Sequence, residues 1–188
     1  KTPVWIGGIS PQTAAFVPPS AEFIPDLIAD LERFLNDVPE KTEPLLKAAL
    51  SHVQFETIHP FLDGNGRVGR ILIPLVLYEA DLLRTPALYL SLYFKQTRNA
   101  YYDHLQRVRT HGEWEEWIAY FLEGVATVAG QVVDLAGAIE DLVRRDRDLV
   151  ADHFGQVSAT ASIYGLIAKR VALTGPKAAE ELGISIPT

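Results

Sequence analysis

Residues 59–70 read HPFLDGNGRVGR, and the rest of the chain is best understood from this stretch. It holds an imidazole, a carboxylate, two guanidiniums and three glycines: His59, Asp63, Arg67, Arg70, Gly64, Gly66 and Gly69. Closely spaced glycines let backbone N–H groups approach an anion. The apolar run at 68–78 predicts a helix, and a helix start offers free N–H groups and a positive dipole end. The stretch therefore predicts a phosphate site.

The charged side chains of this stretch suit a nucleotide. Arg67 and Arg70 are three residues apart on one helical face, so both can reach the same phosphate chain. Asp63 lies just before the helix, where a carboxylate would repel a polyphosphate unless Mg²⁺ lies between them. His59 is placed to take a proton from an incoming nucleophile. The alternative is a glycine-rich turn that caps a helix and carries solvated arginines.

The stretch resembles the Fic/Doc family, whose pattern H-x-F-x-D/E-G-N-G-R-x-x-R is matched at all eight specified positions. The resemblance implies a nucleotidyltransferase that moves AMP from ATP to a Ser, Thr or Tyr hydroxyl of a target protein (AMPylation). His59 would be the general base and Asp63 the Mg²⁺ ligand. The phosphate-binding positions implied by the resemblance are Gly64, Asn65, Gly66, Arg67, Val68, Gly69 and Arg70. Kinases of the Doc type have lysine where Gly66 stands, so glycine favours adenylyl over phosphoryl transfer.

Residues 4–19 predict two short β segments around a turn, and therefore a hairpin. The family resemblance implies that this hairpin is a flap, which lies over the nucleotide and aligns the target segment. An irregular N-terminal arm is the alternative. The flap residues and paired tyrosines expected at the adenine and ribose are Thr13, Ala14, Ala15, Phe16, Tyr101 and Tyr102. For the tyrosines the alternative is one core and one surface residue.

The remaining pattern is helical, so we expect an all-α fold: a Fic-domain helical bundle around a buried motif helix. The sequence predicts helices at 20–37, 44–57, 66–79, 113–130 and 158–170, with 131–150 continuing the helix at 113–130. Residues 89–110 are expected to be mostly helical. The helix at 66–79 is apolar nearly all round, which predicts burial on most sides and a place at the hub. His52, on the apolar stripe of its helix, is interpreted as a hydrogen-bonded core histidine, or alternatively as a group behind His59.

We expect a Fic domain at 1–135 (flap about 4–19, motif 59–70), a linker helix at 136–154 and a partial winged-helix segment at 155–188. Residues 174–185 resemble the first helix and turn of a helix-turn-helix, whose second helix would begin at Ile186. Contact with DNA through this incomplete segment is possible, and a protein contact is equally open.

Composition narrows the class of protein. The chain has 188 residues, 48% of them hydrophobic, with a mean hydropathy of +0.08, which is typical of a globular protein. A net charge of −7 argues against a broad nucleic-acid surface, and the absence of cysteine excludes disulfides. No apolar run looks long enough to span a bilayer, so we expect a cytoplasmic protein without membrane association. A homo-oligomer remains open.

The sequence also bears on how the activity is regulated and on which other functions the motif could serve. Many Fic relatives carry an inhibitory helix, S/T-x-x-x-E-G/N, but the Glu123–Gly124 pair has Ala119 four residues before it. We therefore expect the inhibitory segment upstream of Lys1 and this chain to be deregulated, with self-AMPylation possible. One competing function is a DNA-binding regulator that only senses nucleotide. Another is AMP removal, which would need the inhibitory glutamate.

Overall fold

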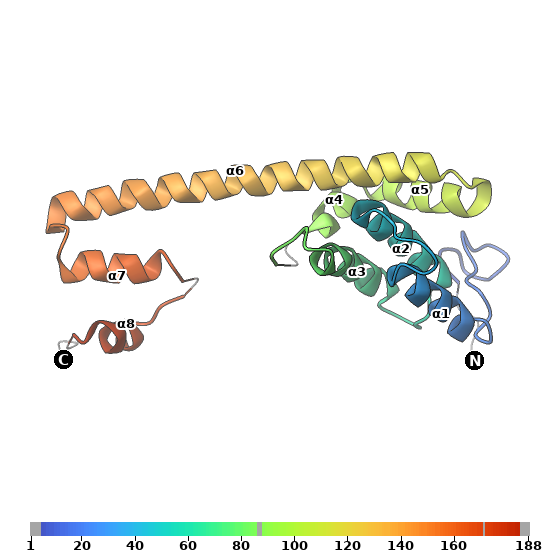
Figure 1. Cartoon of the computed structure of the whole chain (residues 1–188), viewed down its shortest axis with the longest axis horizontal. Coiled ribbons are helices and arrows are strands. Elements are labelled where there is room, and N and C mark those ends of the chain that lie inside the picture. Colours follow the sequence, from blue (N-terminus) through green and yellow to red (C-terminus); the bar gives the residue numbers. More distant parts are fainter. Residues whose placement is uncertain (1–4, 86–87, 171, 185–188) are drawn as a thin grey trace. The chain divides into compact units, whose positions relative to one another are not determined.

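The structure is a computed structural model that describes residues 5–85, 88–170 and 172–184 (Figure 1). Within these ranges it holds eight α-helices and one isolated β-bridge, which confirms the all-α class. The helices are α1 (Ile24–Leu35), α2 (Pro44–Ile58), α3 (Asn65–Glu79), α4 (Leu90–Gln96), α5 (Arg98–His111), α6 (Trp114–Phe154), α7 (Ala159–Ile167) and α8 (Gly175–Leu182). The chain divides into two compact units, Lys1–Gly130 and Gln131–Thr188.

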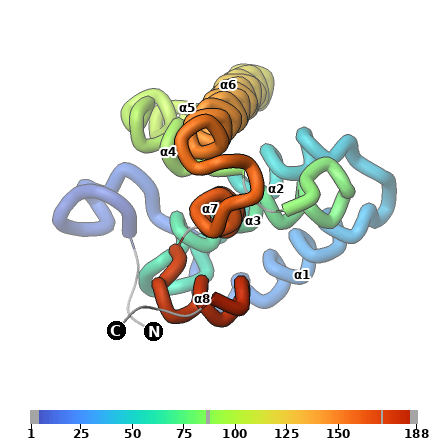
Figure 2. Tube along the Cα trace, turned by 90° about the vertical axis from the view of Figure 1, so that its left-hand side faces the viewer, coloured from blue at the N-terminus to red at the C-terminus, as the bar shows by residue number. Residues whose placement is uncertain are grey.

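Helix α2 is the most enclosed helix of the first unit and packs against both α1 and α3 (Figure 2). Its buried residues include polar ones: Lys47, Ser51, His52 and Glu56. The motif helix α3 buries one face, with Gly69, Ile73 and Leu77, and leaves Ile71 and Leu75 about half exposed. The prediction that α3 is the buried hub was wrong. Its sequence is apolar all round, but its neighbours cover only one side, and α2 has the central place.

An aromatic cluster closes the core of this unit. Trp117, in the first part of α6, is fully buried, and its Nε1–H donates to the Ala49 carbonyl on α2 at 3.0 Å. Its ring lies against those of His52, Phe94, Tyr101, Tyr120 and Phe121. These rings come from α2, α4, α5 and α6, so the cluster joins four helices around one side chain.

The structure shows where two of the stretches expected to be helical are broken or continuous. Residues 89–110, expected to be mostly helical, form α4 and α5 with a break at Thr97, whose hydroxyl donates to the Tyr93 carbonyl at 2.8 Å and contacts the Tyr120 hydroxyl at 2.6 Å. Such a side-chain bond to the preceding turn competes with helix continuation. The stretch at 131–150 continues the helix at 113–130, as expected, and together they form α6, which is continuous through Gly130.

The N-terminal loop, residues 5–16, folds back on itself but forms no strand in its described residues. A single antiparallel bridge joins Ile6 and Phe16, with Ile6 N–H donating to the Phe16 carbonyl at 2.9 Å. Gly7 and Gly8 follow at once with φ of 70° and 71°, a left-handed conformation that turns the chain out of extended pairing. The predicted two-stranded hairpin is therefore corrected to a loop with one bridge. Val4, also assigned to the flap, lies outside the described residues.

The second unit contains the distal part of α6 with α7 and α8. The Ser158 hydroxyl caps α7 by accepting from Ala161 N–H, and the Tyr164 hydroxyl donates to the Val143 carbonyl of α6 at 3.3 Å. Helix α8 ends at Gly183, which is left-handed with φ 63°, as a turn glycine requires. The second helix expected from Ile186 lies outside the described residues. The helix-turn-helix resemblance therefore stays a prediction.

Helix α6 also bears on the membrane expectation. In the described residues it is the one helix long and apolar enough to cross a membrane, by length and composition alone. The expectation that no such run exists was therefore wrong. The finding is weak evidence for a span, because it rests on one helix and on length and composition alone. In the structure 22% of the apolar window is buried.

Candidate nucleotide-binding site

The loop between α2 and α3 is closed by one side chain. Helix α2 ends at Ile58, and His59 turns the chain with a left-handed backbone, φ 49° and ψ 58°. Asn65, the first residue of α3, is buried. Its Oδ1 accepts from Phe61 N–H at 2.9 Å and its Nδ2 donates to the Phe61 carbonyl at 2.7 Å. Asn65, predicted to bind phosphate, is thus placed where it shapes the loop.

The surroundings of His59 keep its imidazole neutral, with one ring nitrogen able to accept a proton. Its side chain is 15% exposed, and Nδ1 lies 3.3 Å from the Glu56 carbonyl. Because a carbonyl only accepts, Nδ1 carries the proton and Nε2 is left with a free lone pair. Burial, with the positive charge of Arg109 adding to it, lowers the pKa of His59 below its ordinary value, against the opposing hydrogen bond to Glu56. His59 is therefore neutral and able to accept a proton at neutral pH.

The charged residues around the start of α3 make local contacts with one another and with the backbone. The Asp63 carboxylate accepts from Gly64 N–H at 2.6 Å and pairs with Arg67 at 3.2 Å, and both side chains are exposed. Arg70 passes close to Gly66, where a Cβ would lie 3.0 Å from its Nη1. Glycine at 66 therefore leaves room for the Arg70 guanidinium.

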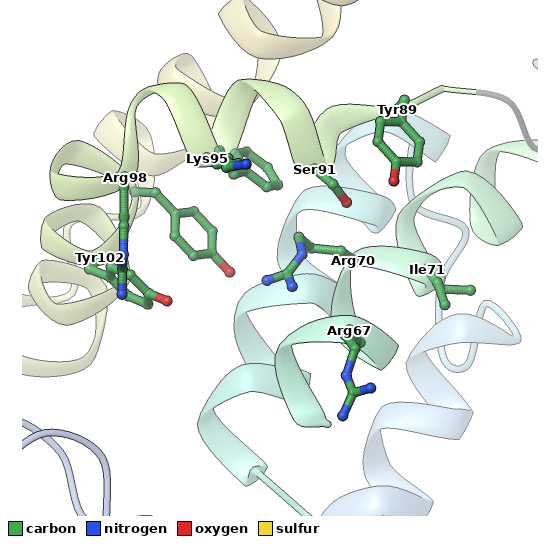
Figure 3. Close-up of a pocket in the computed structure, with 10 residues that line it drawn as sticks. Arg67, Arg70, Ile71, Tyr89, Ser91, Lys95, Arg98 and Tyr102 are labelled. Carbon is green, nitrogen blue, oxygen red and sulfur yellow. The ribbon is translucent and has the colours of Figure 1, made fainter. Parts of the chain in front are cut away.

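A cavity of about 570 Å³ lies beside α3 (Figure 3). Its walls are Arg67, Arg70, Ile71, Tyr89, Ser91, Phe94, Lys95, Arg98, Tyr101 and Tyr102. Four of these residues are cationic and none of the lining residues in the described part of the chain is acidic, so the cavity attracts a polyanion. The aromatic rings give the apolar surface that a base needs. Charge, volume and rings together suit a nucleoside triphosphate.

Part of this lining was missed from the sequence. The missed residues Ser91, Lys95 and Arg98 recur with the predicted Tyr102 at steps of four, three and four residues, and Figure 3 places them on α4 and α5, across from the arginines of α3. This spacing is typical of one helical face, but it does not show that the face lies across from α3. The Arg98 guanidinium also lies 5.6 Å from the centre of the Tyr102 ring.

The residues predicted for the adenine and ribose divide into two groups. Tyr101 and Tyr102 both line the cavity, the first buried and the second half-exposed, which also matches the alternative of one core and one surface tyrosine. Thr13, Ala14, Ala15 and Phe16 are not among its described lining. The Thr13 hydroxyl is used inside the N-terminal loop, where it accepts from Ser10 N–H at 3.1 Å.

His52 links the cavity to the motif. Its Nδ1–H donates to the Gly69 carbonyl at 2.8 Å, which leaves Nε2 to accept from the Tyr101 hydroxyl at 2.9 Å. Full burial lowers the pKa of His52 to about 4, so the ring is neutral and both bonds persist. The interpretation of His52 as a hydrogen-bonded core histidine is confirmed. The same ring joins α5 to α3 through α2.

The residues present can accommodate Mg²⁺ only together with a nucleotide. Within the described residues, no three His, Asp or Glu side chains gather to hold a metal ion. Asp63 is a single exposed carboxylate beside the arginines of α3. Mg²⁺ is commonly held by one or two carboxylates plus substrate phosphates, and Asp63 fits that role.

Gly69 allows α2 and α3 to approach closely, and replacing it by alanine should destabilise the first unit. The new Cβ would lie 2.6 Å from Glu56 Oε1 and 3.2 Å from the Phe55 ring. Forcing the helices apart should lower the free energy of unfolding by about 1–3 kcal/mol. Urea unfolding followed by tryptophan fluorescence measures this, because Trp5, Trp114 and Trp117 all belong to that unit.

The matched control for this substitution is Gly130→Ala, at an open position within α6 where a Cβ meets nothing within 4 Å. It should be neutral or stabilising by up to about 1 kcal/mol. Equal effects of the two substitutions would show that the contact of Gly69 with Glu56 does not matter.

Comparison with known families places the motif stretch in a known family. Residues 4–77 match the model of the Fic/DOC family. The chain belongs to the Fic/DOC family. The matched residues contain the whole motif loop, His59 and both arginines of α3, whereas Lys95, Arg98 and the two tyrosines lie beyond them.

Several curated Fic/DOC proteins are similar to the chain. A probable protein adenylyltransferase of Aquifex aeolicus (strain VF5) is 46% identical over 71 residues, which is 37% of this chain and 22% of that protein. Protein adenylyltransferase fic-1 of Caenorhabditis elegans is 32% identical over 106 residues, 56% of this chain and 20% of that protein. Protein adenylyltransferase Fic of Drosophila yakuba is 32% identical over 136 residues, 72% of this chain and 24% of that protein. The chain thus spans about a quarter or less of these relatives.

A solved structure supports the Fic fold. A Fic family protein from Desulfovibrio desulfuricans G20 matches with a TM-score of 0.61 and 24% sequence identity. The match covers 91% of this chain and 46% of the other chain. At this identity the likeness concerns the fold alone.

Proposed function

We propose that the protein transfers AMP from ATP to a Ser, Thr or Tyr hydroxyl of a target protein and releases pyrophosphate. The observation that carries the proposal is the arrangement at the start of α3. His59, with a free Nε2, precedes a helix start whose Arg67 and Arg70 line a cationic, aromatic cavity. The curated relatives named as protein adenylyltransferases support the same reaction class.

In the proposed reaction the cavity holds the nucleotide. Arg67, Arg70 and the free N–H groups at the start of α3 bind the phosphates, and Tyr102 offers a ring face to the adenine. Asp63 would hold Mg²⁺, which supplies charge neutralisation on the phosphates. Lys95 and Arg98 add to the positive potential of the same cavity.

The transfer step then involves one base. His59 Nε2 accepts the proton of the target hydroxyl while that oxygen forms a bond to the α-phosphorus. The bond from the α-phosphorus to the bridging oxygen breaks, and pyrophosphate leaves with the electron pair. The arginines of α3 stabilise the charge that develops on the phosphate oxygens. The proton on His59 passes to solvent after the product departs.

Incubation with labelled ATP tests this function. Purified protein, Mg²⁺ and a cell lysate receive ATP labelled at either the α- or the γ-phosphate. Label from α-labelled ATP alone, on a lysate band or on the protein itself, is the expected result. Label from γ-labelled ATP alone would replace the proposal with a kinase. ATP binding without any transfer would favour the nucleotide-sensing function.

A further inference from the structure

One backbone carbonyl joins the catalytic histidine to a neighbouring helix. The Glu56 carbonyl oxygen accepts from His59 Nδ1–H at 3.3 Å and also from Arg109 Nη2 at 3.0 Å. Arg109 Nε donates in addition to the Thr57 hydroxyl at 3.2 Å. Arg109, from α5, therefore binds the C-terminal turn of α2, where a helix has free carbonyls and favours a cation.

The same arginine also holds the N-terminal loop. Its guanidinium lies 4.0 Å from the centre of the Phe16 ring, close enough for a cation–π contact. One turn earlier on α5, the Gln106 amide donates to the Ala15 carbonyl at 3.0 Å. Phe16 pairs with Ile6 in the bridge that joins the two ends of the loop. A contact that restrains Phe16 therefore restrains both ends of the loop. Arg109 thus contacts the loop and the turn before His59 at once.

We propose that Arg109 is a positioning residue that fixes the N-terminal loop against the His59 turn, so that a target segment lying along the loop presents its hydroxyl to Nε2. The inference rests on the proposed function. It identifies Arg109 as the side chain that AMP transfer to a target protein requires. Arg109 does not belong to the described lining of the nucleotide cavity. Replacing Arg109 should therefore impair transfer to the target protein without weakening the binding of ATP.

The geometry also distinguishes arginine from lysine at this position. Nε and Nη2 bind two different groups of α2 while the flat face covers the Phe16 ring. A planar fork can make these contacts together, whereas an ammonium is a single point charge. Arg109→Lys should therefore rescue only part of the effect of Arg109→Ala.

The first test needs no catalysis. Hydrogen exchange followed by mass spectrometry is compared for wild type, Arg109→Ala and Arg107→Ala. Arg107 is the matched control, because it is a nearby arginine on α5 that pairs instead with Asp103 and Glu113. Exchange in residues 5–16 should rise by about tenfold in Arg109→Ala only. Unchanged exchange there would overturn the proposal even if the protein transferred nothing.

The second test separates the acceptor from the nucleotide. Labelling of a fixed lysate from α-labelled ATP should fall by about 10- to 100-fold in Arg109→Ala. ATP affinity, measured by isothermal titration, should stay within about twofold. Phe16→Ala should give the same loss, and the double variant should be no worse than either single one. Equal losses of ATP affinity and labelling would show a merely structural role and contradict the inference, whereas an unlabelled lysate with wild type would contradict the proposed function instead.

Discussion

Replacing His59 should lower the rate of AMP transfer by about 10²–10⁴-fold while ATP binding persists. In the proposed reaction the Nε2 lone pair is the proton acceptor, and His59 is not in the described lining of the cationic cavity. Asparagine is the sharper substitution, because position 59 is left-handed with φ 49° and asparagine tolerates that conformation better than alanine. His59→Asn therefore removes the base without adding the backbone strain of His59→Ala.

Transfer from α-labelled ATP and ATP affinity are measured on the same preparations. His153→Ala is the matched control, since His153 is exposed on the distal part of α6. It should transfer AMP at the wild-type rate. If His59→Asn kept more than about a tenth of the activity, general base catalysis by this residue would be excluded and the proton would have another acceptor.

The largest loss of stability is expected for Trp117→Ala. The side chain is fully buried among the rings of the core cluster, and its N–H is bonded to the Ala49 carbonyl. Removing a buried tryptophan typically costs about 3–5 kcal/mol, because the cavity it leaves only partly collapses. That is a large part of the about 5–15 kcal/mol by which domains are usually stable. Urea unfolding followed by circular dichroism measures the change.

Two further substitutions test which property of Trp117 causes this loss of stability: its ring volume, its N–H donor or its place in the core. Trp117→Phe keeps much of the ring volume but loses the donor, so it should cost clearly less than Trp117→Ala. Trp114→Ala removes a tryptophan that is only half-buried at the start of the same helix. Its cost should be smaller than that of Trp117→Ala. Equal effects of the two alanine substitutions would show that the cluster around Trp117 does not dominate the stability of the first unit.

The motif stretch, residues 59–70, is recognisable from the amino-acid sequence alone. The end of α2 at His59, the left-handed Gly64 and the start of α3 are local properties, because glycines, caps and a following proline act within a few residues. Apolar periodicity likewise predicted α1, α2 and the first part of α6, since a stripe along one helix needs no knowledge of its partners. The family motif lies in the same contiguous residues.

Other features of the site depend on which helices and loops pack against one another. Lys95 and Arg98 join Arg70 in one cavity across about 25 residues of chain, and Arg109 reaches both Phe16 and Glu56. An apolar pattern shows that a face can be buried but not whether another helix covers it, which is why α3 proved half-exposed and α2 central. The position of a side chain relative to distant segments arises from packing of the whole core. Only the tertiary structure could therefore reveal the Arg109 contacts and the full nucleotide cavity.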